Sequence, residues 1–341
     1  MIEAESPVRF GIIGCGIIAD VHAKGIRDTE EAVLTAVYDH AEEVAERFAA
    51  QYSAAVCSTL EELLARDDVD VVCICTPSGL HADQTVMAAR AGKHIIVEKP
   101  MAIRLEDIDR MLDACVKGRV MLSTVFPRRM SPQAQYAKKM IEDGRLGRLS
   151  LCSAYVKLYR DQAYYDSAGW RGTWAMDGGG AMMNQGIHTV DLLQWLAGKV
   201  ESLHGRSKAV LRSIEVEDTA VSLLQYRSGA MGTLEITTTA YKGRGQRLEI
   251  HGERGTLIIE EDDIVFLEID GENVSLPVFE PFRVIPDGHR MQIRDMALAV
   301  REKREPMVPG REGRHSLEII LGTYKSSREQ RDIMLSPPVQ A

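Results

Sequence analysis

Three polar side chains stand at helical spacing in the stretch DGGGAMMNQGIHTVDLLQW, residues 177–195. Successive residues of an α-helix turn by about 100°, so Asn184, His188 and Asp191 are expected within a narrow arc. A histidine there could act as a general base on a substrate hydroxyl, although a buried structural histidine would have the same spacing. The apolar stripe on another side of the helix, which predicts its core face, consists of Met183, Ile187, Val190, Leu193 and Ala197.

A metal site is the other interpretation of an Asn/His/Asp cluster, but the spacing of the possible ligands does not favour it. No second histidine or carboxylate follows at ligand spacing, and the 6 cysteines form no C-x-x-C pair. We therefore expect no metal. Whether the helix is catalytic or only structural depends on what the first hundred residues bind.

A ligand signal stands at Gly14-Cys15-Gly16-Ile17-Ile18-Ala19, a G-x-G-x-x-A pattern between an expected strand and an expected helix. Gly14 permits a tight turn, Gly16 lets the backbone approach a pyrophosphate, and Ala19 permits close packing of helix on strand. The free N–H groups at the helix start, around Ile17 and Ile18, favour an anion. The turn therefore predicts a bound dinucleotide.

Asp39 ends the second expected strand, where a carboxylate can accept hydrogen bonds from both ribose hydroxyls of a dinucleotide. The same charge would repel a 2′-phosphate, and His40 beside it would soften that preference if it were protonated. NAD is therefore the expected cofactor, and NADP is less favoured.

The fourth expected strand ends in Thr76 and Pro77, at the carboxyl edge where doubly wound sheets bind ligands. His81 follows at the start of the next helix and is expected to be a structural or cofactor-edge residue.

Lys99 ends the fifth expected strand, in the sequence V-E-K-P. It follows an apolar run and is expected to point toward the nicotinamide, where it could donate a hydrogen bond to a substrate oxygen and stabilise a developing alkoxide. Glu98 could orient this lysine or balance its charge. A cis peptide bond between Lys99 and Pro100 is expected, because X–Pro bonds alone adopt cis readily.

Alternating apolar and helical runs would position these residues. Such alternation is typical of βαβ units, so residues 1–125 are predicted to form a doubly wound Rossmann domain with a parallel sheet. The expected strands are 8–13, 32–39, 54–57, 69–77, 94–100 and 120–125, and the expected helices are 17–27, 41–52, 59–68, 80–91 and 105–117.

After Val125 the pattern changes to long alternating strands, which predicts that residues 126–341 form a second, α/β domain with an antiparallel sheet. Its last helix, 313–330, is the candidate for packing back on the Rossmann domain. A helix within 126–147 comes first, the strand-like runs are 149–159, 201–211, 219–226, 229–241 and 247–261, and the late helices are 289–303 and 311–330.

Tyrosine, tryptophan and arginine are concentrated in the loop 159–176. Such side chains pack surface loops, but beside a cofactor they also suit a sugar face and an anionic group. Arg171 is the main substrate-binding candidate here, with Arg129 and Tyr159 as further candidates.

As a set, the segments G-C-G-I-I-A, C-T-P-S-G-L-H, V-E-K-P and G-G-G-A-M-M-N-Q-G-I-H-T-V-D resemble the Gfo/Idh/MocA oxidoreductases, in order and over nearly the whole chain. The resemblance implies an NAD(P)-binding domain and an α/β domain whose large open, mainly antiparallel sheet supports homodimers or homotetramers. It implies hydride transfer at a carbon bearing a hydroxyl or keto group in sugars, polyols or nucleotide sugars. The W-R-G-T-W and N-Q-G-I-H segments look somewhat like nucleotide-sugar 3-dehydrogenases, such as those acting on UDP-N-acetylglucosaminuronate.

The resemblance also implies catalytic roles for Lys99 and His188. His188 would remove the hydroxyl proton, Lys99 would stabilise the oxyanion, and hydride would pass to NAD. Asn184 departs from inositol dehydrogenase-like members, which have Asp at this position, so it is expected to bind a substrate hydroxyl instead of relaying a proton. Asp191 is expected either to hold the His188 ring or to make a structural pairing.

Composition sets the remaining expectations. The net charge of −9 argues against nucleic acid as the main partner, and no apolar run in the 341 residues is long enough to span a membrane. The acidic N-terminus lacks the basic region of a signal peptide, so a cytoplasmic enzyme with a sugar-like substrate is expected. Two alternatives stay open. An NAD-dependent glycoside hydrolase acting through transient oxidation would produce no net NADH, and a non-catalytic dinucleotide sensor would need neither Lys99 nor His188.

Overall fold

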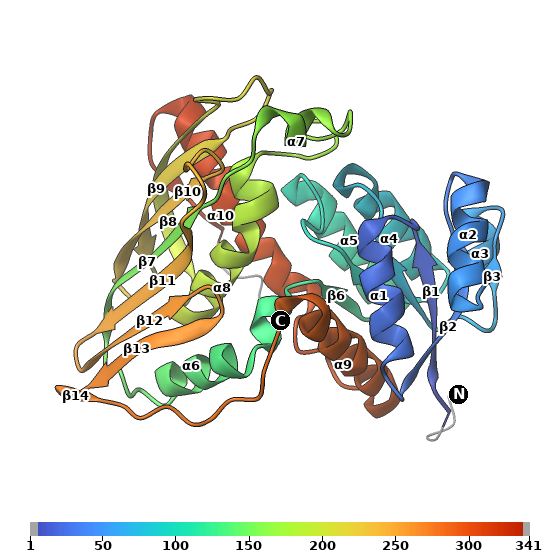
Figure 1. Ribbon diagram of the computed structural model, residues 1–341, viewed down its shortest axis with the longest axis horizontal. Helices are drawn as coiled ribbons and strands as arrows, with labels where there is room; N and C mark the ends of the chain where they lie inside the picture. Colours follow the sequence, from blue (N-terminus) through green and yellow to red (C-terminus); the bar gives the residue numbers. More distant parts are fainter. Residues whose placement is uncertain (1–5, 337–341) are drawn as a thin grey trace. The chain divides into compact units, whose positions relative to one another are not determined.

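The computed structural model describes residues 6–336, which divide into two compact units (Figure 1). Within that range, unit 1 consists of residues 6–130 and 282–313, and unit 2 consists of 131–281 and 314–336. Among these residues, no helix combines the length and the apolar character that crossing a membrane requires.

The sheet of unit 1 is parallel throughout, and its six strands follow the order β3-β2-β1-β4-β5-β6 in the described chain. This is the doubly wound Rossmann arrangement that the alternating pattern predicts. Its elements are β1 (Val8–Ile13), α1 (Ile17–Arg27), β2 (Ala32–Tyr38), α2 (Glu42–Tyr52), β3 (Ala55–Val56), α3 (Leu60–Ala65), β4 (Val71–Ile74), η1 (Ser78–Leu80), α4 (His81–Arg90), β5 (His94–Val97), α5 (Leu105–Gly118), β6 (Leu122–Thr124), η2 (Pro127–Met130), η4 (Val284–Gly288) and α9 (His289–Glu302).

Helix α9 is the reason why residues 282–313 belong to unit 1. Its apolar residues recur at helical spacing and form one stripe, and that stripe lies in the same buried cluster as Phe10 and Ile12 of β1. The chain therefore returns to the Rossmann unit with residues 289–302, and the later helix belongs to unit 2 from Arg314 onward. The residues of the stripe are Ile293, Met296, Ala297 and Val300.

Unit 2 contains a sheet whose nine strands, in the described residues, follow the order β14-β13-β12-β11-β7-β10-β9-β8-β15. Its strand pairs are antiparallel except for β10 with β7, as the expected mainly antiparallel sheet requires. Its elements are α6 (Pro132–Glu142), β7 (Leu149–Lys157), α7 (Gln162–Asp166), η3 (Ala181–Gly186), α8 (Ile187–Ala197), β8 (Val200–Lys208), β9 (Thr219–Tyr226), β10 (Met231–Thr237), β11 (Gly245–Gly252), β12 (Gly255–Glu260), β13 (Asp263–Ile269), β14 (Glu272–Asn273), α10 (Gly310–Glu329), which starts in unit 1, and β15 (Ile333–Met334).

The segment around Asn184 differs from the expected continuous α-helix. Residues Ala181–Gly186 form a π-helix, η3, and the α-helix α8 begins only at Ile187. A π-helix inserts extra residues per turn, which changes the direction of Asn184 relative to the side chains of α8. The expected core stripe of this segment is nevertheless confirmed, since all five of its apolar residues are buried.

The glycines before this helix are required by close contacts inside unit 2. A Cβ atom on Gly180 would lie 1.7 Å from the carbonyl oxygen of Glu217, and one on Gly179 would lie 2.4 Å from the hydroxyl of Tyr324. Because backbone atoms cannot give way as a flexible side chain can, position 180 has no room for a side chain.

We predict that Gly180→Ala lowers the free energy of unfolding by about 3 kcal/mol or more, since the added methyl must displace a buried backbone carbonyl. Urea unfolding of the variant measures this loss. Gly169→Ala is the matched control, because a Cβ at position 169 meets nothing within 4 Å. Equal stability of the two variants would contradict the steric argument.

Candidate active site

The turn between β1 and α1 has the geometry of an anion site. Gly14 has a φ of +88°, and a Cβ there would lie 2.8 Å from the Thr76 side chain, so only glycine fits. Gly16 precedes α1 without any side-chain cap, and a Cβ on it would meet nothing within 4 Å. Ile17 is 90% exposed at the first turn, whereas Ala19 is fully buried against the sheet. The start of α1, with no side-chain cap and no Cβ at Gly16, thus leaves room for a phosphate at the helix N-terminus.

Asp39 lies beside this turn, because β1 and β2 are adjacent parallel strands. Its Oδ2 accepts a hydrogen bond from the Cys15 N–H at 2.8 Å, and its Oδ1 accepts one from the Ala41 N–H at 2.9 Å. The exposed His40 ring lies 3.0 Å from the same carboxylate. These bonds hold Asp39 in place next to the glycine turn. The open cradle and this fixed carboxylate fit a dinucleotide with an unphosphorylated ribose.

Glu98 is the centre of a buried polar network at the end of β5. Its Oε1 lies 2.8 Å from His22 Nε2 and 3.5 Å from His289 Nε2, and its Oε2 accepts a hydrogen bond from the Lys99 N–H at 3.1 Å. His22 belongs to the cofactor helix α1 and His289 begins α9. The carboxylate therefore connects the dinucleotide helix, the returning segment and the backbone of Lys99.

The charge state of this network follows from its contacts. Burial favours the neutral acid, but hydrogen bonds from His22 and His289 outweigh it and hold the pKa of Glu98 well below its usual range. Burial lowers the pKa of His22. An ionised carboxylate can only accept, so both histidines donate through Nε2–H. Sequence inspection missed His22 and His289, because nothing in a single sequence links positions on α1 and α9 to residue 98.

The same three residues could hold a metal ion, since their ligand atoms lie within 4.8 Å of one another. The 2.8 Å separation of His22 Nε2 and Glu98 Oε1 is that of a direct hydrogen bond. The contacts thus favour a hydrogen-bonded network.

The other candidates of unit 1 lie around these groups. Both ring nitrogens of His81 lie near carbonyl oxygens, Nδ1 at 2.9 Å from that of Pro100 and Nε2 at 2.8 Å from that of Thr76, so this buried histidine ties the ends of β4 and β5 together. Pro77 precedes η1, and the Lys99–Pro100 peptide is cis, as expected. Arg129 is buried, and its guanidinium lies 3.4 Å from Glu312.

Unit 2 holds the candidates of the glycine-rich segment. Asn184 is half-buried, and its Nδ2 donates to Asp177 Oδ1 at 2.9 Å. His188 is half-buried in the first turn of α8. Asp191 is buried and accepts a hydrogen bond from the Ser316 hydroxyl at 2.8 Å.

In the loop 159–176, the Arg171 guanidinium lies 4.7 Å from the ring centroids of both Tyr164 and Trp170 and donates to the Tyr164 hydroxyl at 2.9 Å. Tyr159 is partly exposed, with the Arg212 guanidinium over its ring. Arg171 is therefore fixed by aromatic contacts within unit 2.

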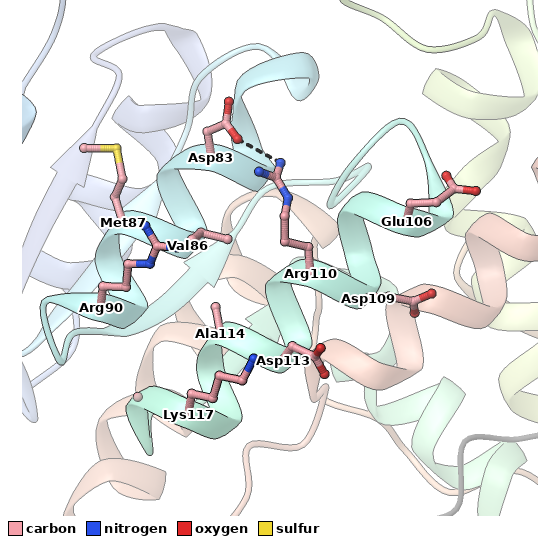
Figure 2. Close-up of a pocket in the computed structure, with 11 residues that line it drawn as sticks. Asp83, Val86, Met87, Arg90, Glu106, Asp109, Arg110, Asp113, Ala114 and Lys117 are labelled. Atoms are coloured by element: carbon pink, nitrogen blue, oxygen red, sulfur yellow. Dashed lines mark ion pairs between the residues drawn. The ribbon is translucent and has the colours of Figure 1, made fainter.

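A hollow of about 1040 Å³ lies at α4 and α5 (Figure 2). Its walls carry charges of both signs, and Figure 2 shows Asp83 and Arg110 paired across the two helices, 2.8 Å apart. None of the predicted site residues lines it. The hollow is therefore separate from the residues predicted to bind cofactor and substrate.

We predict that His22→Ala lowers the free energy of unfolding by about 3–5 kcal/mol, because it removes one donor from a buried charged partner. Chemical denaturation measures this change. His40→Ala is the control, since the ring of His40 is exposed, and it should stay within about 0.5 kcal/mol of the parent. Treatment of the parent protein with a chelator should leave its melting temperature unchanged, and a clear fall would mean that a metal holds the network.

We predict that Asp39→Asn weakens NADH binding by roughly tenfold and reduces the ratio of NADH affinity to NADPH affinity. The reason is that an amide accepts weaker hydrogen bonds from the ribose hydroxyls than a carboxylate does, and it does not repel a 2′-phosphate. Titration of protein fluorescence with both cofactors measures this. Asp67→Ala, at an exposed position, should change neither affinity. An unchanged preference in Asp39→Asn would show that another residue selects the cofactor.

Known proteins similar to this chain agree with the geometry. Residues 8–126 match the model of an oxidoreductase family with an NAD-binding Rossmann fold, and residues 134–258 match the GFO/IDH/MocA C-terminal domain. The chain is 29% identical, over 96% of its length and 99% of the relative, to inositol 2-dehydrogenase of Rhizobium meliloti.

Solved structures give the same result. The WlbA dehydrogenase of Bordetella pertussis, solved with NADH and UDP-GlcNAcA, is 37% identical, with 97% of this chain and 99% of that chain covered and a TM-score of 0.88. The corresponding enzyme of Chromobacterium violaceum, with the same ligands, is 34% identical, with 97% and 96% covered and a TM-score of 0.88. With both domain models matched over most of its length, the chain belongs to the Gfo/Idh/MocA family and is an NAD-dependent oxidoreductase.

Proposed function

We propose that this chain oxidises a secondary alcohol, or reduces the corresponding ketone, on the sugar ring of a nucleotide sugar that carries a carboxylate. The observation that carries the proposal is the higher identity to the two dehydrogenases solved with UDP-GlcNAcA than to the inositol dehydrogenases. A polyol such as inositol is the second candidate, supported by the coverage of nearly the full length of those relatives.

Lys99 and His188 are the proposed catalytic residues. The 14–19 turn and Asp39 would hold NAD, which would supply the acceptor for the hydride of the carbinol carbon. His188 takes the hydroxyl proton, and the Lys99 ammonium stabilises the oxygen as negative charge develops on it. Glu98 supports this arrangement, since it is hydrogen-bonded to the backbone N–H of Lys99. In the reverse direction His188 returns the proton to the alkoxide, which Lys99 stabilises.

The proposed substrate contacts lie on both sides of the glycine run. Asn184 is held by Asp177 through its amide nitrogen, and an amide oxygen is a group that accepts a hydrogen bond from a sugar hydroxyl. Arg171, stacked on two aromatic rings, is suited to a carboxylate or phosphate oxygen. Tyr159 and Arg129 stay as further proposals, and the buried position of Arg129 beside Glu312 favours an indirect part for that residue.

We also propose that the chain is a homodimer or homotetramer that pairs through the sheet of unit 2. Along β9, alternate residues are buried and exposed, and the exposed ones include Val221 and Leu223, with Leu223 61% exposed. Met231 of β10 and Leu151 of β7 are register partners and are also exposed. Exposed apolar side chains on neighbouring strands favour a protein interface.

A cytoplasmic location is proposed as well, since all six cysteines are buried thiols without a disulfide.

We predict that UDP-GlcNAcA, with NAD, produces the absorbance of reduced nicotinamide. We also predict that Lys99→Ala lowers kcat about 100-fold or more while the affinity for NADH changes little. The reason is that Lys99 acts on the reacting oxygen, whereas the cofactor is held by the turn and Asp39. Lys117→Ala, an exposed lysine on α5, is the control and should keep its activity.

Several results would contradict the proposal. Turnover of inositol but not of the nucleotide sugar would assign the second substrate class, and retained turnover in Lys99→Ala would remove the role given to that lysine. Tightly retained cofactor with cleavage of a glycoside and no net NADH would indicate the hydrolase alternative.

A further inference from the structure

Glu217 lies two residues before β9, is 2% exposed, and accepts hydrogen bonds from three consecutive N–H groups at the start of η3. The Gly180 N–H donates to its Oε2 at 2.8 Å, the Ala181 N–H to its carbonyl oxygen at 2.9 Å, and the Met182 N–H to its Oε1 at 2.8 Å. The first N–H groups of a helix have no partner within it. Glu217 therefore caps this helix from a distant part of the sequence.

The fit around this cap is close. Tyr324 of α10 donates its hydroxyl to Glu217 Oε1 at 2.8 Å. The space that side chains at Gly179 and Gly180 would need is taken by the Tyr324 hydroxyl and the Glu217 carbonyl. The glycine run is thus shaped around Glu217, so the carboxylate and the turn that it caps form one unit.

The cap is close to the residues proposed for substrate chemistry. The Asn184 N–H donates to the Gly180 carbonyl at 2.9 Å, so the residue whose own N–H is held by Glu217 also fixes the backbone of Asn184. The next turn along the same segment carries His188.

We propose that Glu217 is a positioning residue for Asn184 and His188, which acts by capping η3 and so fixing the direction of both side chains toward the substrate. This rests on the proposed function, in which Asn184 binds and His188 removes a proton. A displacement of about 1 Å at reacting groups can lower turnover roughly 100-fold, so a loosened cap should affect chemistry and not only stability.

The charge of Glu217 gives the cap a property that can be measured. Burial raises the pKa of Glu217 to about 7, although the three hydrogen bonds to its carboxylate oppose this shift. The titratable groups near it include two phenols, Tyr324, which donates to it, and Tyr165 of α7. The next residue, Asp218, is also buried, and its carboxylate accepts hydrogen bonds from the N–H groups of residues 210–212. On protonation, the carboxyl O–H would face N–H donors, and one hydrogen bond of the cap would be lost.

The pH dependence of stability has a definite sign. The folded state keeps the Glu217 proton up to about pH 7, whereas the unfolded chain releases it near the ordinary pKa of a glutamate. Glu217 therefore makes the free energy of unfolding decrease as the pH rises from about 4.5 to about 7.

The test compares the parent enzyme with Glu217→Gln, using the full chain. We expect kcat to fall about tenfold or more and KM for the sugar substrate to rise, with NADH affinity unchanged because the cofactor binds in unit 1. Amide hydrogen exchange at positions 180–184 should become faster. The infrared band of the protonated Glu217 carboxylic acid, which in the parent should titrate near pH 7, should be absent from the variant.

Tyr324→Phe removes one of the three carboxylate hydrogen bonds and should give a smaller loss of kcat. Glu201→Gln, at an exposed position of β8, should match the parent.

Unchanged kcat, KM and amide exchange in Glu217→Gln would overturn the proposal. A lowered melting temperature with unchanged kcat per folded molecule would also overturn it, because Glu217 would then be only structural. If the parent itself turned over no sugar substrate, the proposed function would fail, and the exchange and infrared results would still report separately on the cap.

Discussion

Parallel pairing of β1, β2, β4 and β5 brings four chain segments to one edge of a sheet, and the site in unit 1 depends on this constraint. The glycine turn follows β1, Asp39 follows β2, Thr76 follows β4, and Glu98 with Lys99 follows β5. A carboxylate buried at that edge must be compensated, and His22 and His289 donate to it. The position of Lys99 is thereby linked to the cofactor helix and to the segment 282–313, which returns to this unit.

In unit 2 as well, buried polar groups must find hydrogen-bond partners. A helix start inside the protein leaves N–H groups that need acceptors, and Glu217 supplies three of its oxygens to consecutive residues. The glycines 179 and 180 are therefore explained by contacts with Glu217 and Tyr324. A π-helix then carries Asn184, and α8 carries His188. In both units, a buried glutamate with defined donors lies next to the residues to which we assign chemistry.

Much of this could be predicted from the sequence, and most of the features that could not be predicted share a cause. Local spacing was sufficient for the alternating Rossmann elements, the geometry of the 14–19 turn, NAD as the cofactor and the buried stripe of the 183–197 segment. Contacts between residues far apart in the sequence could not be predicted from local spacing. His289, the return of α9, the cap by Glu217 and the π-helix all depend on residues far apart in the chain, and β13 was missed because it follows β12 with only a short turn.

In the proposed reaction, hydride leaves the carbinol carbon of a sugar-like substrate and reaches the nicotinamide directly. This transfer is tested with UDP-GlcNAcA deuterated at each ring carbinol carbon in turn, with NAD, and mass spectrometry of the NADH formed. We expect deuterium from one ring carbon to appear in the nicotinamide, and the substrate to lose two hydrogens, one from that carbon and one from its oxygen. NADH without deuterium from any labelled position, or deuterium found only in solvent, would contradict it.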